Sequence, residues 1–405
     1  FQFGMELNMS NLVRLFACAS LLFVLPLDAA QLPDAPAGAV RFYNVANSDF
    51  DVYTQSPSST AQQWMRSHYA RMQTYTPYFD GRLPWYPGAW AYKNIFGVSV
   101  GSTVAVQHPE WLLRDSSGNL LYIDWACANG TCPLYAADFG NSAYRTYWVS
   151  QAVALIGKGY KGLWIDDVDM DFRTSNGSGT RVIASDPRTG QAMTLANWRR
   201  YMAEILEQVR AAVPKAELAH NAVWYSANSL TDSYIRRQID AADYINLERG
   251  ATDKGLVYGA GQWGFETFLA YVDFVHARGR SVIMMDYGST TTDREFGLAG
   301  MLLANQGRDM LSGNQLDWTA PDRWWTGYDT NLGESNGLRY KWNGLLRRDF
   351  QCGMVLANQP GASTISVSLP SAFTTLTGSQ VTSVTLGARQ AKVLKSECTE
   401  GGSCH

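Results

Sequence analysis

Segments with the pattern of a β-strand alternate with segments with the pattern of a helix over most of this chain. Hydrophobic runs predict strands at residues 40–46, 92–98, 134–138, 162–166, 217–223, 243–248, 281–286 and 309–311. Apolar periodicity and capping residues predict helices at residues 60–74, 141–158, 194–213, 231–241, 266–278 and 293–306. Eight strands alternating with helices over about 270 residues match an α/β fold of the closed (β/α)8 barrel type, which takes roughly 250 residues. No Gly-x-Gly-x-x-Gly turn follows the first strand, so the sequence favours the barrel over an open doubly wound sheet.

The C-terminal part of the chain has a different pattern. Helical periodicity is lost from about Leu345, and short strands are predicted at residues 352–357, 363–369, 380–386 and 391–394, separated by prolines and glycines. The sequence therefore predicts a catalytic barrel over residues 38–340, followed by a small C-terminal β-sandwich over residues 345–398. We expect the sandwich to pack against the barrel.

The N-terminal segment has the pattern of an export signal. Arg14 precedes an apolar run at residues 15–27, which is too short to span a bilayer and ends at the small residues Ala29 and Ala30. Residues 1–30 are therefore predicted to be a signal peptide that is cleaved near Ala30. We expect a secreted or periplasmic protein without a membrane anchor.

Export makes disulfide bonds permissible. Cys18 would leave with the signal peptide, and five of the six cysteines would remain. The close pair Cys127 and Cys132 is predicted to form one disulfide. Cys352 is predicted to pair with Cys398 or Cys404, which leaves one thiol over.

Four aspartates follow the predicted strand at residues 162–166, in the run GYKGLWIDDVDMD. Asp166, Asp167, Asp169 and Asp171 repel one another and lose hydration beside an apolar strand, so a protein that keeps them there usually has a use for them. Asp166 is the first polar residue after a strand of the buried type. Barrel enzymes carry their catalytic groups at such strand ends.

A second acidic residue, Glu248, ends another predicted barrel strand two places further on. Both side chains are expected at the same mouth of the barrel, as a carboxylate pair that flanks a scissile glycosidic bond. The sequence thus predicts a glycoside hydrolase that needs no cofactor. We expect Asp286 at the same mouth, and the predicted substrate-binding residues are Asp167, Tyr43, Asp138, His220, Asn221, Arg249 and Asp286.

The stereochemistry can also be predicted. Two strands separated by one other strand have backbones roughly 10 Å apart, and side chains that lean inward shorten the distance between their carboxyl groups. A retaining enzyme needs about 5 to 5.5 Å between them, and an inverting enzyme about 6.5 to 9.5 Å. We predict a retaining mechanism with Asp166 as nucleophile and Glu248 as general acid and base.

The same residues carry a family resemblance. The acidic run, with ADFGNSAYRTYWV before it, resembles the hypothetical glycosyl hydrolase family 15 and is more distantly similar to the endo-α-1,4-polygalactosaminidases. The resemblance covers the predicted barrel and extends to LRRDFQCGMVLANQP in the tail. It implies a catalytic pair at Asp166 and, in DYINLERG, Glu248. Arg249 and Gly250 stand where the polygalactosaminidase signature has a second acidic residue and a cysteine.

Composition narrows the possible partners. The net charge of -3 and the lack of a run rich in lysine and arginine argue against a nucleic acid or an anionic membrane. Aromatic residues make up 13% of the chain, with 14 Trp and 21 Tyr, and such side chains can stack on sugar rings. The expected partner is an oligo- or polysaccharide substrate, bound by a monomer. The P-loop pattern of nucleotide-binding proteins is absent from the sequence.

Two alternatives stay open. Asp167, Asp169 and Asp171 alternate along the chain and could chelate Ca²⁺ or Mg²⁺. An EF-hand is excluded because Phe172 and Ser178 stand where its glycine and its final glutamate belong. The second alternative is a carbohydrate-binding barrel without catalytic activity.

Overall fold

A computed structural model describes residues 32–398 except 126, 129–130, 225–229 and 314–317. The predicted signal peptide and the cysteines Cys18 and Cys404 lie outside the described residues. Within the described ranges, no helix has both the length and the apolar character needed to cross a membrane.

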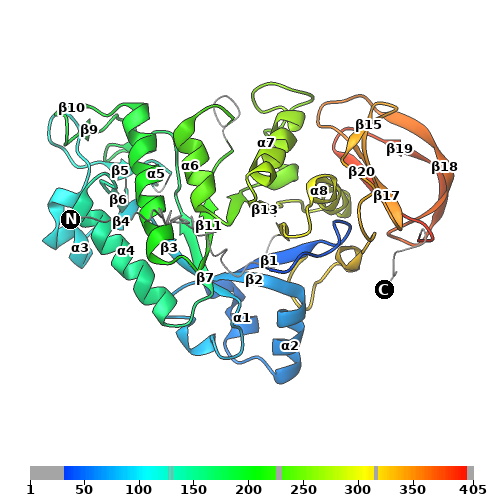
Figure 1. Ribbon diagram of the computed structural model, residues 1–405, viewed down its shortest axis with the longest axis horizontal. Helices are drawn as coiled ribbons and strands as arrows, with labels where there is room; N and C mark the ends of the chain where they lie inside the picture. Colours follow the sequence, from blue (N-terminus) through cyan, green and yellow to red (C-terminus); the bar gives the residue numbers. More distant parts are fainter. Residues whose placement is uncertain (1–31, 126, 129–130, 225–229, 314–317, 399–405) are drawn as a thin grey trace, which may run out of the picture.

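Eight parallel strands close into a barrel, in which each strand pairs with its neighbours in chain order (Figure 1). The barrel closes where β14 pairs with β1, with Met310 opposite Arg41. The predicted barrel is confirmed. Its strands are β1 (Arg41–Ala46), β2 (Tyr69–Thr74), β3 (Ala89–Asn94), β7 (Gly162–Asp166), β11 (Glu217–Asn221), β12 (Tyr244–Leu247), β13 (Ser281–Met285) and β14 (Met310–Ser312).

One predicted helix extended into a barrel strand, and one predicted strand lies outside the barrel. The helix predicted at residues 60–74 is α2 (Ser59–His68), and the chain then runs directly into β2, the second barrel strand. The predicted strand at residues 134–138 is β6 (Leu134–Ala136), which lies outside the barrel in a sheet with β4 (Gly97–Ser99), β5 (Tyr122–Ile123) and β8 (Thr174–Ser175). Because one strand was missed and one was misassigned, β7 remains the fourth strand of the barrel.

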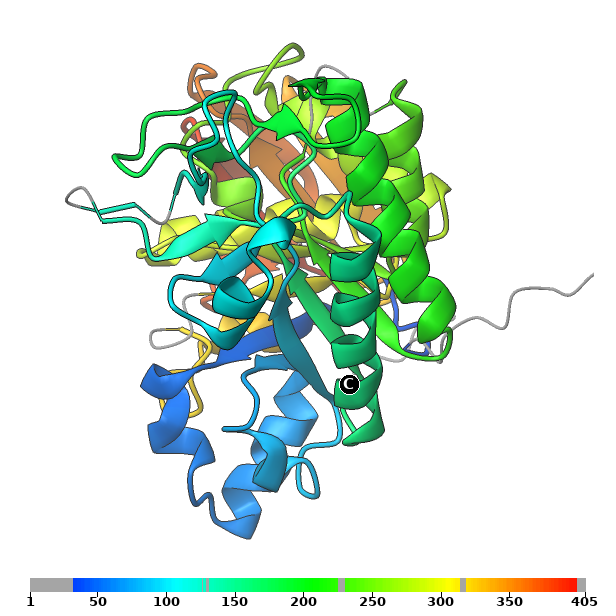
Figure 2. The ribbon, with the colours of Figure 1, turned by 90° about the vertical axis from the view of Figure 1, so that its left-hand side faces the viewer.

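The five helices from α4 to α8 were predicted correctly to within two residues at each end. They are α4 (Ser142–Gly157), α5 (Leu195–Ala212), α6 (Ser233–Ala241), α7 (Phe265–Ala277) and α8 (Thr291–Ala304). Side chains cap the first turns of all of them except α7, whose N-cap residue is Gly264. The Asn141 carboxamide oxygen accepts from two backbone N–H groups of α4, and Thr290 forms a capping box with Asp293 of α8. Figure 2 shows α4, α5 and α6 side by side along one flank of the barrel.

The remaining described elements are short. They are α1 (Asp51–Thr54), α3 (Thr103–Gln107), β9 (Ser185–Asp186), β10 (Gln191–Ala192) and the 3-10 turns η1 (Ser48–Phe50), η2 (Asp80–Arg82), η3 (Pro109–Trp111), η4 (Gly250–Thr252) and η5 (Thr326–Asp329). All except η5, which follows β14, lie in connections between barrel strands, and most lie between β1 and β7.

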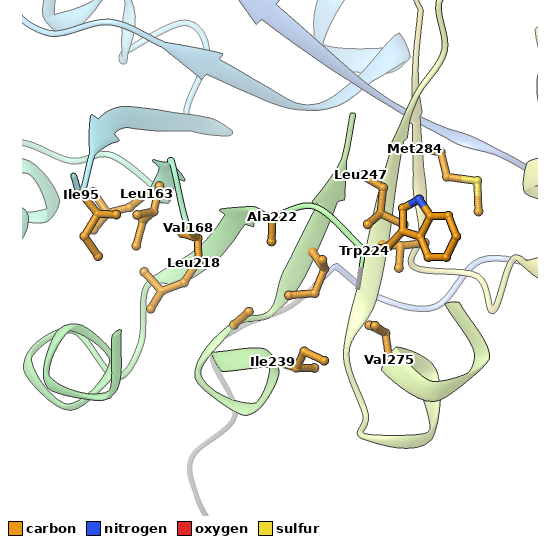
Figure 3. Packing of buried hydrophobic residues seen from close by; sticks show 14 of the residues in the cluster. Ile95, Leu163, Val168, Leu218, Ala222, Trp224, Ile239, Leu247, Val275 and Met284 are labelled. Atoms are coloured by element: carbon orange, nitrogen blue, oxygen red, sulfur yellow. The ribbon is translucent and has the colours of Figure 1, made fainter. Parts of the chain in front are cut away.

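Side chains alternate between the two faces of each barrel strand, as the pleat requires. One set faces the helices: Figure 3 shows Leu163, Leu218, Leu247 and Met284, from four neighbouring strands, in one packed layer with Ile239 of α6 and Val275 of α7. The other set fills the barrel interior and consists of Tyr43, Trp90, Trp164, Ala219, Tyr244, Ile283 and Met310. The interior is therefore a packed core, and a ligand can bind only at one of its ends.

The N-terminal end of the barrel interior holds a buried ion pair. Arg71 of β2 donates from Nε and Nη2 to the two carboxyl oxygens of Glu217, at 2.5 and 2.6 Å. Trp90 Nε1 donates to the same carboxylate at 2.8 Å. Glu217 is fully buried, and the hydrogen bonds from Arg71 and Trp90 compensate its negative charge.

The C-terminal residues form a single six-stranded antiparallel sheet. Its spatial order is β15 (Tyr340–Trp342), β16 (Leu345–Phe350), β17 (Gly353–Asn358), β20 (Gln390–Lys395), β18 (Ile365–Thr375) and β19 (Gln380–Leu386). The four predicted strands are present, whereas β15 and β16 were not predicted. The strands join into one sheet, so the predicted sandwich is not confirmed. Leu345, Met354, Leu356 and six other residues form an apolar cluster of the sheet's own.

Helix α8 lies between the barrel and the C-terminal sheet (Figure 1). The helix is buried from Arg294 to Ala304. Glu295 accepts from Lys392 Nζ of β20 at 2.5 Å, and Arg348 Nη1 of β16 donates to the carbonyl oxygens of Leu302 and Asn305 at 2.8 and 2.9 Å. The sheet therefore supplies donors for the unpaired carbonyl groups at the C-terminal end of α8.

Two disulfide bonds are present. Cys127 pairs with Cys132, as predicted. Cys352 pairs with Cys398, one of the two partners that the sequence left open.

Candidate active site

A cavity of about 450 Å³ opens at the C-terminal ends of β7, β11 and β12. We call it the mouth cavity. It brings together five of the nine predicted site residues, namely Asp166, Asp167, Asn221, Glu248 and Arg249. Its other lining residues are Trp125, Asp169, Arg173, Ala222, Val223, Trp224, Leu247, Asp253 and Trp263.

Strand register places the polar groups of the mouth cavity at one level. Ile165 of β7 pairs with His220 of β11, so the next residues, Asp166 and Asn221, end neighbouring strands side by side. Asn221 in turn pairs with Asn246 of β12. Glu248 follows β12 directly, on the exposed side of this polar layer.

One amide group joins the two acidic residues that were predicted as a catalytic pair. Asn221 Nδ2 donates to Asp166 Oδ1 at 2.8 Å and to Glu248 Oε1 at 3.1 Å. Asn246 Nδ2 donates to Asn221 Oδ1 at 2.7 Å, which fixes the orientation of the Asn221 amide. The carboxylates of Asp166 and Glu248 therefore both accept from Asn221 Nδ2.

The Asp166 carboxylate is held by three donors. Besides Asn221, it accepts from the hydroxyl of Tyr92 at 2.7 Å and from the backbone N–H of Asp167 at 2.9 Å. The Tyr92 ring stacks on Trp164, one layer deeper in the barrel, with 5.8 Å between ring centroids. Burial, together with the negative charge of Asp166, raises the pKa of Tyr92 far above its usual range, so the phenol stays a donor.

Asp167 and Asp169 are nearly buried beside this carboxylate. Asp167 has a φ of 56° and accepts from Asn94 Nδ2 at 2.6 Å and from Trp125 Nε1 at 3.0 Å. Burial raises the pKa of Asp167 to about 7, and the charges of Asp166 and Asp169 add to the effect. Burial also raises the pKa of Asp169 to about 7, although Arg173 at 3.8 Å acts in the opposite direction.

The acidic run does not form a chelate. Asp167 contacts Asn94 and Trp125, Asp169 contacts Arg173, and Asp171 pairs with Arg199 at 2.7 Å. Across the described ranges, no group of three His, Cys, Asp or Glu side chains is placed to hold a metal ion. The alternative of a metal-binding Asp cluster is thus not supported.

Three tryptophans line the mouth cavity. Trp125 is 50% exposed and Trp263 is 43% exposed, while Trp224 is buried behind Trp263 in an edge-to-face contact with 5.3 Å between centroids. A sugar ring has an apolar face, which can stack on an exposed indole ring, and hydroxyl groups, which can bind to carboxylates. The mouth cavity offers both kinds of group.

Two of the predicted substrate-binding residues do not reach the mouth cavity because they lie in other layers. Tyr43 is fully buried in the barrel interior, where its hydroxyl donates to Gln73 Oε1 at 2.6 Å. Asp138 follows β6, outside the barrel, and its two carboxyl oxygens accept from Arg188 Nη1 at 2.8 and 2.9 Å. Asp138 does not line the mouth cavity because β6 is not a barrel strand.

His220 and Asp286 are on barrel strand ends but face outward. Nδ1 of His220 lies 3.1 Å from Gln238 Nε2 of α6, and burial lowers the pKa of His220 to about 3, which keeps the ring neutral. Asp286 accepts from the Thr252 hydroxyl and contacts α8 at Gly297, and burial raises its pKa well above the usual range. The sequence predicted that Asp286 lies at the mouth with Asp166 and Glu248. Instead, Asp286 follows β13 and faces α8, and it does not line the mouth cavity.

Sequence reasoning missed Tyr92, Asn246 and Trp125. The first two follow from strand alternation, because Tyr92 is two residues after the inward Trp90 and Asn246 is two residues after the inward Tyr244. Trp125 carries no such signal. It comes from the long connection between β4 and β6.

A carboxylate pair at the C-terminal mouth of a closed barrel is an arrangement found in glycoside hydrolases, and comparison with known families agrees. The chain belongs to the hypothetical glycosyl hydrolase family 15, which it matches over residues 86–354. It is therefore a glycoside hydrolase. Comparison with curated proteins gave no match.

Solved structures resemble the chain only distantly. The glycoside hydrolase domain of PelA from Pseudomonas aeruginosa is 15% identical, over 70% of this chain and 96% of that domain, with a TM-score of 0.41. The α-galactosidase from Lactobacillus brevis is 10% identical, over 92% of this chain and 56% of that enzyme, with a TM-score of 0.47. The GH31 dextranase of Flavobacterium johnsoniae is 11% identical, over 91% of this chain and 52% of that enzyme, with a TM-score of 0.49.

Proposed function

We propose that this protein is an exported glycoside hydrolase that cleaves a polysaccharide by a two-step retaining mechanism, with Asp166 as nucleophile and Glu248 as general acid and base. The observation that carries the proposal is the single Asn221 amide that donates to both carboxylates. The proposed reaction needs no cofactor, because the two carboxyl groups supply the nucleophile and the proton transfers.

The bridging amide limits the distance between the two carboxyl groups. The bonded oxygens Asp166 Oδ1 and Glu248 Oε1 lie within about 5.9 Å of each other, the sum of the two hydrogen bonds. Retaining enzymes hold their carboxyl groups about 5 to 5.5 Å apart, whereas inverting enzymes leave about 6.5 to 9.5 Å for a water molecule. The bridge thus favours retention.

The surroundings of the two carboxylates support different roles. Asp166 is fixed by three donors and is only partly exposed, as a nucleophile that must meet one carbon atom requires. Glu248 is exposed and receives the Asn221 bond, so its longer side chain can follow the oxygen that it protonates. The assignment of acid and nucleophile follows from this difference.

In the first step, the Glu248 carboxyl gives its proton to the glycosidic oxygen while an oxygen of Asp166 bonds to the anomeric carbon and the leaving sugar departs. In the second step, Glu248 takes a proton from water, the water oxygen bonds to the anomeric carbon, and the bond to Asp166 breaks. Two inversions give net retention. The Tyr92 hydroxyl and the Asn221 amide compensate the charge of Asp166 before and after the covalent intermediate.

Several features support a polysaccharide substrate outside the cytoplasm. The exposed rings of Trp125 and Trp263 offer stacking surfaces on the rim of the mouth cavity. The apolar segment at residues 15–27 and the two disulfides suit export into an oxidising compartment. We expect the exported enzyme to act as a monomer.

The first test is a screen of the purified protein, without residues 1–30, against bacterial cell-surface and exopolysaccharide glycans. We expect one glycan to be shortened, with the anomer first released having the configuration of the substrate by NMR. An inverted first product would overturn the retaining mechanism but not the hydrolase. A glycan that binds and is never cleaved would instead support the carbohydrate-binding alternative.

The acid role of Glu248 is tested by Glu248→Gln. We expect this variant to lose about 10²- to 10⁴-fold on the glycan but much less on an aryl glycoside, whose leaving group needs little protonation. Glu266→Gln is a matched control, since Glu266 lies on α7 and pairs with Lys341. Full activity of Glu248→Gln on the glycan would remove Glu248 from the acid role.

A further inference from the structure

A second cavity, of about 350 Å³, lies next to the mouth cavity. We call it the side cavity. Arg249 and Asp253 line both cavities, so the two share a wall. The other residues that line the side cavity are Thr252, Lys254, Tyr287, Gly288, Ser289, Asp293, Phe296 and Arg389. No residue of the predicted site other than Arg249 is among them.

The side cavity lies beyond Glu248 as seen from Asp166. Around the barrel, β7 with Asp166 is followed by β11, by β12 with Glu248 and then by β13. Arg249 and Thr252 follow Glu248 in the chain, and Tyr287 follows β13. A ligand that runs from the mouth cavity into the side cavity would therefore pass Asp166, Glu248 and Tyr287 in that order.

The C-terminal sheet builds one wall of the side cavity. Arg389 stands in the turn between β19 and β20, with a φ of 56°. Its Nη1 donates to the carbonyl oxygen of Asp253 and its Nη2 to that of Leu256, both at 2.8 Å. Gln359 Oε1, after β17, accepts from the backbone N–H of Gly259 at 3.0 Å. The sheet thus holds the loop that follows Glu248.

The side cavity offers the groups that a sugar ring needs. Tyr287 is 57% exposed and presents an aromatic face to the side cavity. Phe296, the other aromatic residue of the lining, is buried in the core and packs on Phe265. Lys254, Asp293 and Arg249 supply charged donors and acceptors near these rings. A cavity of this size is at the lower end of the range for small-molecule sites, roughly 300 to 1,000 Å³, and suits a short segment of a sugar chain.

We propose that the side cavity binds the sugar units on the leaving-group side of the scissile bond, so that the C-terminal sheet takes part in substrate binding. The inference rests on the proposed function, in which Glu248 protonates the oxygen of the leaving sugar. Units past Glu248 are then leaving-group units. The substrate class is a chain with at least two sugars beyond the cleaved bond, and the enzyme cuts within that chain.

The test compares Tyr287→Ala with Tyr287→Phe on two kinds of substrate. One is a series of oligosaccharides of increasing length, prepared from the glycan that the wild-type enzyme cleaves. The other is the 4-nitrophenyl glycoside of the same sugar, whose leaving group is a single ring. We expect Tyr287→Ala to lower kcat/KM about tenfold on the long oligosaccharides and less than about twofold on the aryl glycoside. Tyr287→Phe should keep most of the activity because the ring remains.

The matched control is Tyr340→Ala. Tyr340 is an exposed tyrosine of β15 that lines neither cavity. This variant should match the wild type on both substrates. Equal losses for Tyr287→Ala on short and long substrates, or no loss on either, would overturn the proposal.

A binding assay separates this proposal from the proposed function. Affinity electrophoresis with the screened glycans measures binding in an Asp166→Asn background, in which no cleavage is expected. There, Tyr287→Ala should bind the glycan about tenfold more weakly and Tyr340→Ala should bind it normally. Binding without cleavage by the wild-type enzyme would contradict the proposed function alone, and a glycan bound equally by both variants would contradict the side cavity alone.

Discussion

The two ends of the barrel interior each hold a carboxylate, but the two carboxylates have different hydrogen-bond donors. At the N-terminal end, Glu217 is bound on both oxygens by Arg71 and also by Trp90, and the space is closed. At the C-terminal mouth, Asp166 meets the neutral donors of Tyr92 and Asn221 and borders an open cavity. The carboxylate of Glu217 is thus neutralised by a cation, whereas the carboxylate of Asp166 keeps its negative charge at an open cavity.

This difference separates stability from reactivity. A buried carboxylate with a bidentate arginine costs several kcal/mol to disrupt, because removal of one partner leaves a charge without compensation. A carboxylate that is held by neutral donors keeps its nucleophilic oxygen, and the negative charges around it remain a cost to folding. Four substitutions test this contrast, from the largest expected effect to the smallest.

Replacement of Asp166 should have the largest effect on activity. Asp166→Asn removes the proposed nucleophile, and we expect glycan hydrolysis to fall at least about 10³-fold with no loss of thermal stability. Asp171→Asn is the control, because Asp171 belongs to the same acidic run but is exposed and pairs with Arg199. Initial rates and thermal unfolding of both variants test the prediction. More than about a tenth of the wild-type rate in Asp166→Asn would contradict it.

Replacement of Glu217 should have the largest effect on stability. Glu217→Ala leaves Arg71 buried without its partner, and we expect the free energy of unfolding to fall by about 3 to 5 kcal/mol. Glu207→Ala removes an exposed partner of Arg237 and should cost about 0 to 1 kcal/mol. Denaturant unfolding measures both. The folded Glu217→Ala protein should keep its rate of hydrolysis, and a loss of rate without a loss of stability would show that the N-terminal end takes part in the reaction.

Asn221 should matter for rate rather than stability. Asn221→Ala removes the donor shared by Asp166 and Glu248, and a hydrogen bond to a charged group contributes about 1.5 to 3 kcal/mol. We therefore expect kcat to fall about 10- to 100-fold. Asn119→Ala, in an exposed turn, is the control. An unchanged kcat in Asn221→Ala would show that the shared amide does not position the pair.

Replacement of Asp169, which lies beside Asp166, should have the smallest effect, a change in how stability depends on pH. With a pKa of about 7 for Asp169, the folded protein keeps a proton that the unfolded chain releases near pH 4. Stability should therefore fall as the pH rises from about 4 to about 7 and stay low above that, because the folded state binds more protons in this interval. Asp169→Asn should remove roughly 1 to 3 kcal/mol of this decline.

Thermal unfolding of Asp169→Asn across this pH range measures the effect. Asp49→Asn, at an exposed position, should follow the wild-type curve. The prediction for Asp169 fails if both variants decline in parallel with the wild type. In that case, the burial of Asp169 does not control its protonation.

Local signals were sufficient for most of the fold. Capping residues such as Asn141 and Thr290 stand at the starts of helices that were predicted from the sequence. The failure at residues 69–74 has a physical cause. Met72 continues the apolar spacing of the preceding helix and is also buried as a strand residue, so periodicity alone could not show where the helix ends.

The site was predictable at the level of strand ends and not at the level of side-chain direction. Asp166 was recognised because polar residues follow a buried strand. His220 and Asn221 are neighbours on β11, yet one faces Gln238 of α6 and the other faces the mouth cavity. A shift of one residue in register exchanges the two faces, and the sequence does not fix the register that closely. Trp125 depends on the path of a long loop, which local patterns do not determine.

The position of β20 sets the order in which the chain can finish folding. β20 lies between β17 and β18 in the C-terminal sheet and packs on α8. Ribosomes make roughly 5 to 20 residues per second, so α8 waits several seconds after its synthesis before β20 can cover it. During this interval one face of α8 meets water or a chaperone. A translation pause between residues 312 and 390 would lengthen that exposure and would favour aggregation of the nascent chain.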